Sequence, residues 1–168
     1  NILQEVNKNI QNRRDLDDIL HIIMTGVTAG YGLGFNRAAL LMLDRDHNGM
    51  RGRIAIGCMD NDSAQVDWKD SHRSRLDDFK NYLEALEKGV IKPTPLQLAI
   101  KDKLFTAPPD QLKHFLERLN EDKYIEVSPE EASYFTDFYE AFQPTSPILI
   151  VPLISREEVI GLMVADNK

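Results

Sequence analysis

The chain has almost no cysteine, because Cys58 is the single one among its 168 residues. One thiol cannot form an internal disulfide, and it cannot build a zinc site that needs several cysteines. We therefore expect a reducing compartment, the cytoplasm. Long apolar runs are also missing, since no segment approaches the ~20 apolar residues that a membrane helix needs. We expect no membrane span in this segment.

Basic charge is scarce as well. The 20 Lys and Arg residues are outnumbered by 27 Asp and Glu, which gives a formal net charge of -7. A protein that holds a phosphate backbone needs a clustered basic face, whereas the acidic residues here are spread through the helical segments. Nucleic acid is therefore not an expected partner.

The composition that is present is typical of a globular protein, with 42% hydrophobic and 28% charged residues. A chain of this size buries roughly 70% of the surface that its unfolded form exposes, so we expect one domain across residues 1–168. The chain starts at Asn1 without a methionine, and we expect it to be a segment of a longer protein.

Two helices are predicted at the start of the chain. Residues 1–14 carry a narrow apolar stripe at helical spacing, formed by Ile2, Leu3, Val6 and Ile10. Such a stripe is typical of a helix that pairs with another helix, but packing on its own domain explains it equally well, and both interpretations stay open. The second helix is predicted over residues 15–29, with Asp15 as its cap and an apolar face of Leu16, Ile19, Leu20, Ile23 and Val27.

Residues 32–44 turn the chain from helix to sheet. A strand over residues 36–43 is apolar on both faces, which predicts cover on each side, and it forms a hairpin with residues 52–58. The glycines at 30, 32 and 34 lack the preceding strand and following helix of a phosphate loop. The turn at 44–49 resembles the start of a calcium loop, but the position that needs a bidentate Glu is Ala55. We predict neither site.

The middle of the chain contains most of the aromatic residues. A helix is predicted over residues 62–88, where Trp68 either packs in the core or lines a pocket, and another begins at residue 109. Ser128-Pro129-Glu130-Glu131 has the form of a capping box, and it predicts a helix that carries Tyr134, Phe135, Phe138, Tyr139 and Phe142. Such a dense group is typical of a core or of a small-molecule pocket. The candidate ligand-binding residues are Trp68, Tyr134, Phe138 and Tyr139.

The last residues contain the clearest β pattern. Residues 148–154 and 159–165 are apolar almost throughout, and residues 155–158 connect them as a hairpin. Pro152 is expected at a sheet edge or a bulge, because it has no backbone N–H to donate.

Four features in this order resemble the GAF domain, a sensory module of signalling proteins. They are the capped helix at 15–29, Gly-Leu-Gly-Phe-Asn-Arg-Ala from Gly32, Arg-Gly-Arg-Ile-Ala-Ile-Gly from Arg51, and the hairpin of Val-Pro-Leu-Ile from Val151 with Val-Ile-Gly-Leu-Met-Val-Ala-Asp-Asn from Val159. The resemblance implies an α+β sandwich, in which a central antiparallel sheet of about six strands has helices on both faces. It also implies a ligand cavity between the sheet and a variable segment at about 92–144.

The resemblance further implies a noncatalytic sensory or regulatory domain of a larger bacterial protein, such as a sensor histidine kinase or a cyclic-dinucleotide enzyme. Such a domain binds a small molecule and relays its state to an effector domain through the terminal helices of a homodimer. Residues 1–14 would then be the signalling helix, with Ile2, Leu3, Val6 and Ile10 as the dimer interface. A ligand-free dimerisation module with a filled core is the alternative.

The specific chemistries of the family do not carry over to this chain. The variable segment has no cysteine for a bilin, the Asn-Lys-x-Phe-Asp-Glu signature of cyclic-nucleotide binders is absent, and the cysteines that reduce free methionine sulfoxide are missing. The four histidines include no pair at zinc spacing. We predict no enzyme and no required cofactor. A small enzyme, or a haem sensor that uses His72 or His114, remains open as an alternative.

Overall fold

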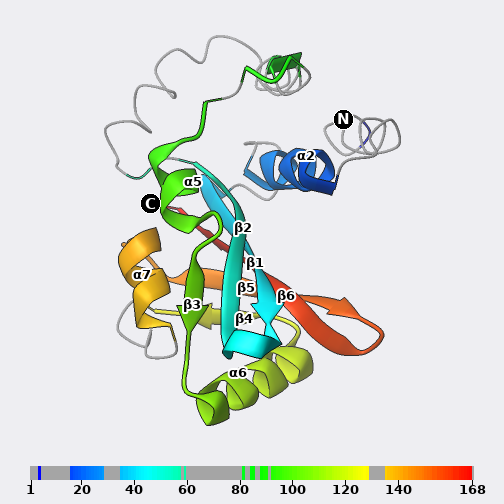
Figure 1. The fold of residues 1–168 in the computed structure, drawn as a ribbon, viewed down its shortest axis with the longest axis vertical. Coiled ribbons are helices and arrows are strands. Elements are labelled where there is room, and N and C mark those ends of the chain that lie inside the picture. Colours follow the sequence, from blue (N-terminus) through cyan, green and yellow to red (C-terminus); the bar gives the residue numbers. More distant parts are fainter. Residues whose placement is uncertain are drawn as a thin grey trace.

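The computed structural model describes residues 4, 16–28, 35–57, 59, 81, 84–85, 88–90, 92–128 and 135–167. Its elements in chain order are α2 (Leu16–Thr28), β1 (Arg37–Asp44), the 3-10 helix η1 (Arg45–His47), β2 (Gly49–Ile56), α5 (Pro95–Ile100), β3 (Leu104–Thr106), α6 (Pro109–Asp122), β4 (Ile125–Val127), α7 (Thr136–Phe142), β5 (Ile148–Ser155) and β6 (Glu158–Asp166). The six strands form one antiparallel sheet in the order β3-β2-β1-β6-β5-β4 (Figure 1).

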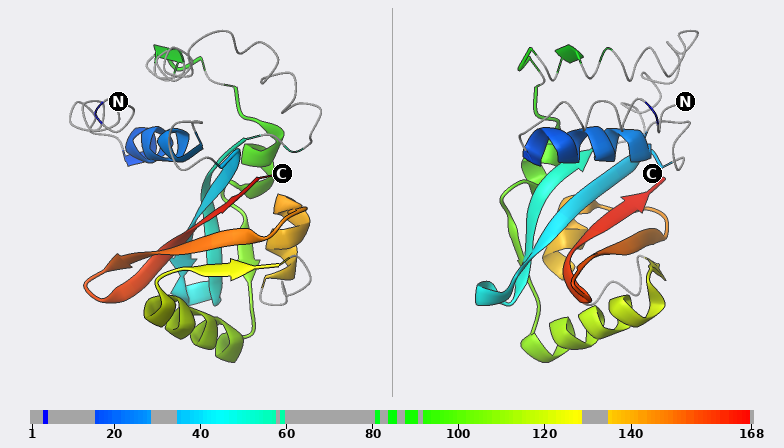
Figure 2. Two further views of the ribbon diagram at one scale, coloured as in Figure 1. Left: turned by 180° about the vertical axis from the view of Figure 1, so that it is seen from behind. Right: turned by 90° about the vertical axis from the view of Figure 1, so that its right-hand side faces the viewer.

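The strand β1 lies in the middle of the sheet and is covered on both faces. Ala39 and Leu41 belong to the larger core cluster, to which α5, α6 and α7 contribute. Ala38 and Leu40 pack with Met24 of α2 on the other face. Figure 2 shows α2 and α6 on opposite sides of the twisted sheet. The predicted α+β sandwich, with six antiparallel strands and helices on both faces, is confirmed.

The buried face of the helix α2 matches the predicted one only in part. Leu20, Met24 and Val27 pack toward the sheet, whereas Leu16 and Ile23 are 58% and 38% exposed. The predicted face is confirmed at Leu20 and Val27 and wrong at Leu16 and Ile23. Apolar residues occur on nearly every side of α2, so their spacing alone does not select the buried stripe.

Two hairpins build most of the sheet. Between β1 and β2, the carboxylate of Asp44 accepts a hydrogen bond from the backbone N–H of His47 at 3.3 Å, and Asn48 takes the left-handed conformation with φ of 49°. This short turn lets β2 begin at Gly49, earlier than the predicted residue 52. Between β5 and β6, Arg156 and Glu157 have positive φ values of 50° and 67°, as a two-residue hairpin turn requires.

Pro152 lies in β5 beyond the part that β4 covers. β4 pairs only with Ile148 to Ile150, and the register of β5 against β6 shifts between Leu153 and Ile154. A residue without an N–H is tolerated there because the open side of the strand loses no ladder bond. The predicted edge or bulge position is confirmed.

The opposite edge of the sheet is closed by α5. β3 pairs only with Gly49 to Arg51 of β2. No other described strand pairs with the rest of β2 on this side, opposite to β1. Instead, the side-chain Oε1 of the buried Gln97 accepts the backbone N–H of Ala55 at 2.5 Å. A Cβ at Gly52 would lie 1.9 Å from the carbonyl oxygen of Ile100. α5 therefore takes the place of a strand and covers backbone groups that an edge otherwise exposes.

The helices α6 and α7 differ in how closely they follow the prediction. α6 buries Leu112, Phe115 and Leu119, as its spacing predicts. α7 begins at Thr136, later than the capping box predicts, and Phe135 precedes it in a non-helical conformation with φ of -138° and ψ of 69°.

Most of the helix predicted over 62–88 lies outside the described residues. In the described part of the chain, no helix combines the length and apolar character that a membrane crossing requires.

Candidate ligand cavity

A small, largely enclosed cavity lies between the sheet and the helices α6 and α7. It measures about 20 Å³, which is space for little more than one water molecule. All its lining residues except Tyr139 have hydrocarbon side chains, and together they are Leu41, Phe115, Val127, Phe135, Phe138, Tyr139, Ile148, Ile150, Leu162 and Val164. Strands β1, β4, β5 and β6 therefore form one wall, and the aromatic residues of the helical side form the other.

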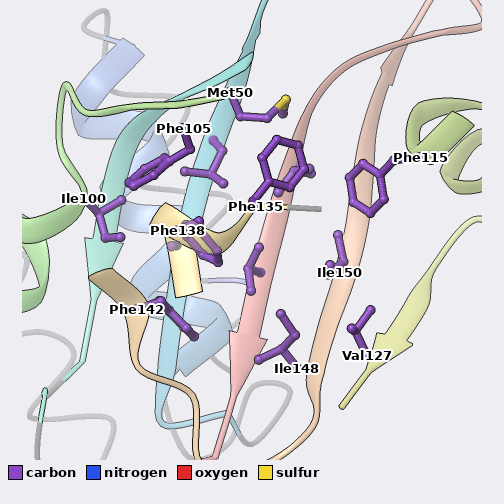
Figure 3. Packing of buried hydrophobic residues seen from close by; sticks show 14 of the residues in the cluster. Met50, Ile100, Phe105, Phe115, Val127, Phe135, Phe138, Phe142, Ile148 and Ile150 are labelled. Carbon is purple, nitrogen blue, oxygen red and sulfur yellow. The ribbon is translucent and has the colours of Figure 1, made fainter. Parts of the chain in front are cut away.

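Aromatic rings hold α7 against the sheet (Figure 3). Phe138 meets Phe105 edge to face, with ring centroids 5.3 Å apart, and it stacks on Phe142 at 5.2 Å. Phe115 of α6 meets Phe135 edge to face at 5.4 Å. Both geometries are favourable for aromatic pairs. The rings occupy much of the space between α7 and the strands, which leaves the cavity far smaller than the ~300 Å³ of a typical ligand pocket.

The structure places two of the four predicted ligand-binding residues at this cavity. Phe138 is 3% exposed and Tyr139 is half-buried, and both line the space. The same rings also belong to the core or pack against it. The aromatic group therefore forms part of the core and also lines a cavity, which are the two roles that its sequence allows. Trp68 and Tyr134 lie outside the described residues, as do the four residues of the predicted dimer interface: Ile2, Leu3, Val6 and Ile10.

A buried ion pair lies where β1, β6 and α7 meet. Arg37 and Asp166 are cross-strand partners, and each is 1% exposed. The Nε of Arg37 donates to Oδ1 of Asp166 at 2.7 Å, and its Nη2 donates to Oδ2. Its Nη1 donates to the carbonyl oxygen of Phe142 at 2.9 Å, and its guanidinium carbon lies 4.4 Å from the centre of the Phe142 ring. One side chain thus connects two strands to the end of the cavity-lining helix.

Sequence reasoning missed this pair. Arg37 stands at the start of the apolar run of β1, and Asp166 stands at the end of the apolar run of β6. Charged residues are almost never fully buried unless they are paired. Opposite charges at the ends of two apolar strands are therefore the signal, but the register that brings them together is visible only once β1 and β6 are known to be neighbours.

A second, open cleft of about 520 Å³ lies between α2, β2 and α5. His21 lines this cleft together with Asp17, Asp18 and Lys101. Burial lowers the pKa of His21 below its ordinary value, Lys101 lowers it further, and the two aspartates oppose the shift. The neutral imidazole is therefore favoured in the folded protein.

The candidate metal and haem ligands of the chain do not gather at the cavity in the part that the structure describes. Within the described ranges, no group of three His, Cys, Asp or Glu residues is placed to hold a metal ion. His114, a candidate haem ligand, is exposed on α6 and does not line the cavity. His72, the other candidate, lies outside the described residues.

No model of a known protein family matches the sequence, and no curated protein matches it. Solved structures match at the level of the fold. Residues 122 to 287 of a methyl-accepting chemotaxis protein are similar with a TM-score of 0.55 and 19% identity, over 99% of this chain and 82% of that chain. The GAF domain of an Acinetobacter phosphoenolpyruvate-protein phosphotransferase has a TM-score of 0.55 and 12% identity, over 99% and 75%. The GAF domain of such a protein from Coxiella burnetii has a TM-score of 0.50 and 14% identity, over 99% and 75%.

These similarities define the fold class of the chain as an α+β sandwich. More particularly, the chain has a GAF-like fold, as the four matching features of its sequence predict.

Proposed function

We propose that the chain is a noncatalytic sensory or regulatory domain of a larger, cytoplasmic signal-transduction protein from a bacterium. In this proposal it binds a small molecule and relays its state to an effector domain through the terminal helices of a homodimer. The observation that carries the ligand part is the apolar cavity between the sheet and α7. The GAF-like fold supports the regulatory part, because a chemotaxis protein contains a similar domain.

The lining of the cavity favours a small and uncharged ligand. Every lining side chain is hydrocarbon except that of Tyr139. The free energy needed to remove a charge from water is far larger than the free energy that contacts with such side chains supply. Because the cavity is only about 20 Å³, a ligand enters only if α7 or its aromatic side chains move outward. Binding would therefore change the position of α7 relative to the sheet.

The dimer part is supported by the exposed side of α2. Leu16 and Ile23 are 58% and 38% exposed and stand one heptad apart, which is the spacing of a helix-helix seam. The stripe predicted within residues 1–14 is likewise apolar and at helical spacing. A second chain that covers both would remove this apolar surface from water.

A ligand-free dimerisation module is the second candidate, and the small size of the cavity favours it. The aromatic contacts of Phe138 with Phe105 and Phe142 already stabilise α7 against the sheet without any ligand. In that case the same fold serves only to present α2 and the N-terminal residues to a partner chain.

Native mass spectrometry of the purified chain tests both candidates, because it reports the oligomeric state together with any retained small molecule. The proposed function predicts a dimer that carries the extra mass of a ligand. A dimer without added mass supports the dimerisation module. A monomer at micromolar concentration contradicts the dimer in both candidates.

A matched pair of substitutions locates the ligand. Val164→Ile adds one methylene beside the cavity, and Val151→Ile adds the same group on the neighbouring strand but on the opposite face of the sheet. If the cavity binds the ligand, only Val164→Ile lowers the retained amount. If the cavity stays empty, Val164→Ile instead raises the free energy of unfolding by up to about 0.8 kcal/mol, measured by urea denaturation. Equal ligand retention in both variants would place the ligand elsewhere.

A further inference from the structure

We propose that Arg37 is a positioning residue that couples the cavity to the end of β6. This inference rests on the proposed function, because it assigns the route by which a ligand would act on the part of the chain that follows the sheet. Its basis is one buried guanidinium that contacts both α7, which lines the cavity, and Asp166, the last residue of β6.

On the side of α7, Arg37 binds the end of the helix. Its Nη1 donates to the carbonyl oxygen of Phe142 at 2.9 Å, and its Nη2 donates to that of Gln143 at 3.5 Å. The last carbonyl groups of a helix have no partner within the helix, so Arg37 supplies one. The ring of Phe142, against which the guanidinium packs, stacks on Phe138. An outward movement of α7 that enlarges the cavity therefore displaces the acceptors of Arg37.

On the side of the sheet, Arg37 binds the point where β6 ends. The bidentate contact with Asp166 fixes the carboxylate. The backbone N–H of Asn36, the neighbour of Arg37, lies 3.3 Å from the carbonyl oxygen of Asp166 and 3.0 Å from Oδ1 of Asn167, and bonds to both. The hydroxyl of Ser146 donates to the carbonyl oxygen of Asn167 at 3.4 Å. A displacement of Arg37 is therefore transmitted to Asp166 and Asn167.

The guanidinium suits this role because its planar fork donates in several directions at once. In Arg37 the fork donates to both carboxylate oxygens of Asp166 and to two carbonyl oxygens at the end of α7. The acceptors on Asp166 and Phe142 are buried, and leaving any one of them unpaired costs free energy. The end of α7 and the end of β6 are therefore linked through Arg37, and a displacement of one displaces the other.

The test uses benzene as a probe in the full chain with the substitution Ile150→Ala. This change removes three carbon atoms on the sheet side of the cavity, away from Arg37, and an enlarged apolar cavity of that kind binds benzene. Benzene has six carbon atoms and the original cavity is only about 20 Å³, so its binding still requires an outward movement of α7. Amide NMR spectra report the response of α7 (Thr136–Phe142) and of Ala165, Asp166 and Asn167. We expect benzene to shift the signals of both regions. In Ile150→Ala with Arg37→Met, the response of α7 remains, while that of residues 165–167 falls by about threefold or more.

The matched control is Arg53→Met in the same background. Arg53 also stands on a central strand, but it pairs with Asp17 of α2 at 2.8 Å and lies outside the contacts of Arg37. It should leave both responses unchanged. If Arg37→Met does not fold, Asp166→Asn weakens the same pair and is expected to reduce the response of residues 165–167 alone.

The outcomes separate the two proposals. An undiminished response of residues 165–167 without Arg37 overturns the coupling and leaves the proposed function intact. Loss of the response in α7 as well overturns it too, since Arg37 would then only support the fold. Failure of benzene to bind Ile150→Ala removes the ligand part of the proposed function, and the coupling with it.

Discussion

Arg37 brings a full charge into a core that is otherwise almost entirely hydrocarbon. Arg37→Met is expected to lower the free energy of unfolding by about 3–5 kcal/mol, because Asp166 is left buried without a partner. Chemical denaturation measures this loss. Arg37→Met combined with Asp166→Leu should be less destabilised than Arg37→Met alone, since the double variant leaves no unpaired charge. Equal losses in the single and double variants would contradict this explanation.

Arg53 provides the comparison for the stability cost of removing Arg37. It forms an ion pair with Asp17, but the side chains are 43% and 47% exposed. A pair in contact with water contributes ~0–1 kcal/mol. Arg53→Met should therefore cost far less than Arg37→Met, although both variants remove one arginine from a strand.

His21 should make the stability of the fold depend on pH. Burial lowers the pKa of His21, with Lys101 acting in the same direction and Asp17 and Asp18 opposing it. The unfolded chain, with an ordinary pKa of about 6.5, therefore binds a proton before the folded chain does. The contribution of His21 to the free energy of unfolding is complete at pH values above the pKa of the unfolded state. It is lost as the pH falls toward the lower pKa of the folded state.

The measurement is urea denaturation across this pH range. His21→Gln should flatten the decline in stability, because glutamine does not titrate. His114→Gln is the control, since His114 is exposed on α6 and its removal should leave the decline in place. An unchanged decline in His21→Gln would show that another group causes it.

At the scale of elements, the contact of α5 with β2 depends on one glycine. Gly52→Ala is expected to lower the free energy of unfolding by about 3 kcal/mol, the upper range for overpacking, because the new Cβ meets the backbone of Ile100 at 1.9 Å. Thermal unfolding measures the loss. Leu98 lies on α5, as Ile100 does, but its side chain is 64% exposed. Leu98→Ala should therefore change the free energy of unfolding by less than about 0.5 kcal/mol. A mild effect of Gly52→Ala would mean that α5 can move away from β2 freely.

The elements also show what the sequence can predict. The spacing of Leu112, Phe115 and Leu119 identifies α6, and the apolar runs identify β1, β5 and β6. The sequence does not reveal that Gln97 binds the edge of β2, because a single polar residue in a short apolar helix has no periodic signal. It also places the start of α7 too early, because a capping box describes only the local backbone.

At the scale of the whole molecule, the fold could be predicted and the site only in part. The order of helix, central hairpin and final hairpin is enough to define the GAF-like sheet. The aromatic group that contains Phe138 and Tyr139 locates the cavity. Its size could not be predicted, because a void of about 20 Å³ depends on the packing of side chains from α6, α7 and four strands at once.

The oligomeric state is the remaining property of the whole molecule. We expect Leu16→Glu with Ile23→Glu, or Val6→Glu alone, to shift a dimer toward monomer, because each variant places charge in the proposed apolar seam. Sedimentation over a range of concentrations measures the shift. Leu98→Glu is the matched control, since Leu98 is an exposed leucine on α5. A control that dissociates equally would point to a general loss of stability instead of an interface.

The antiparallel pairing of β1 with β6 also determines how the sheet responds to mechanical load. Asn36 and Asn167 lie side by side at the same end of the two strands. Tension applied at these two residues pulls the strands apart one hydrogen bond after another, in the manner of a zipper, and does not shear all the bonds together. After the hydrogen bonds of Asn36, the pair of Arg37 and Asp166 is the first cross-strand pair that such a force meets. Among the described residues, the buried ion pair of Arg37 and Asp166 therefore strengthens the end of the sheet at which peeling begins.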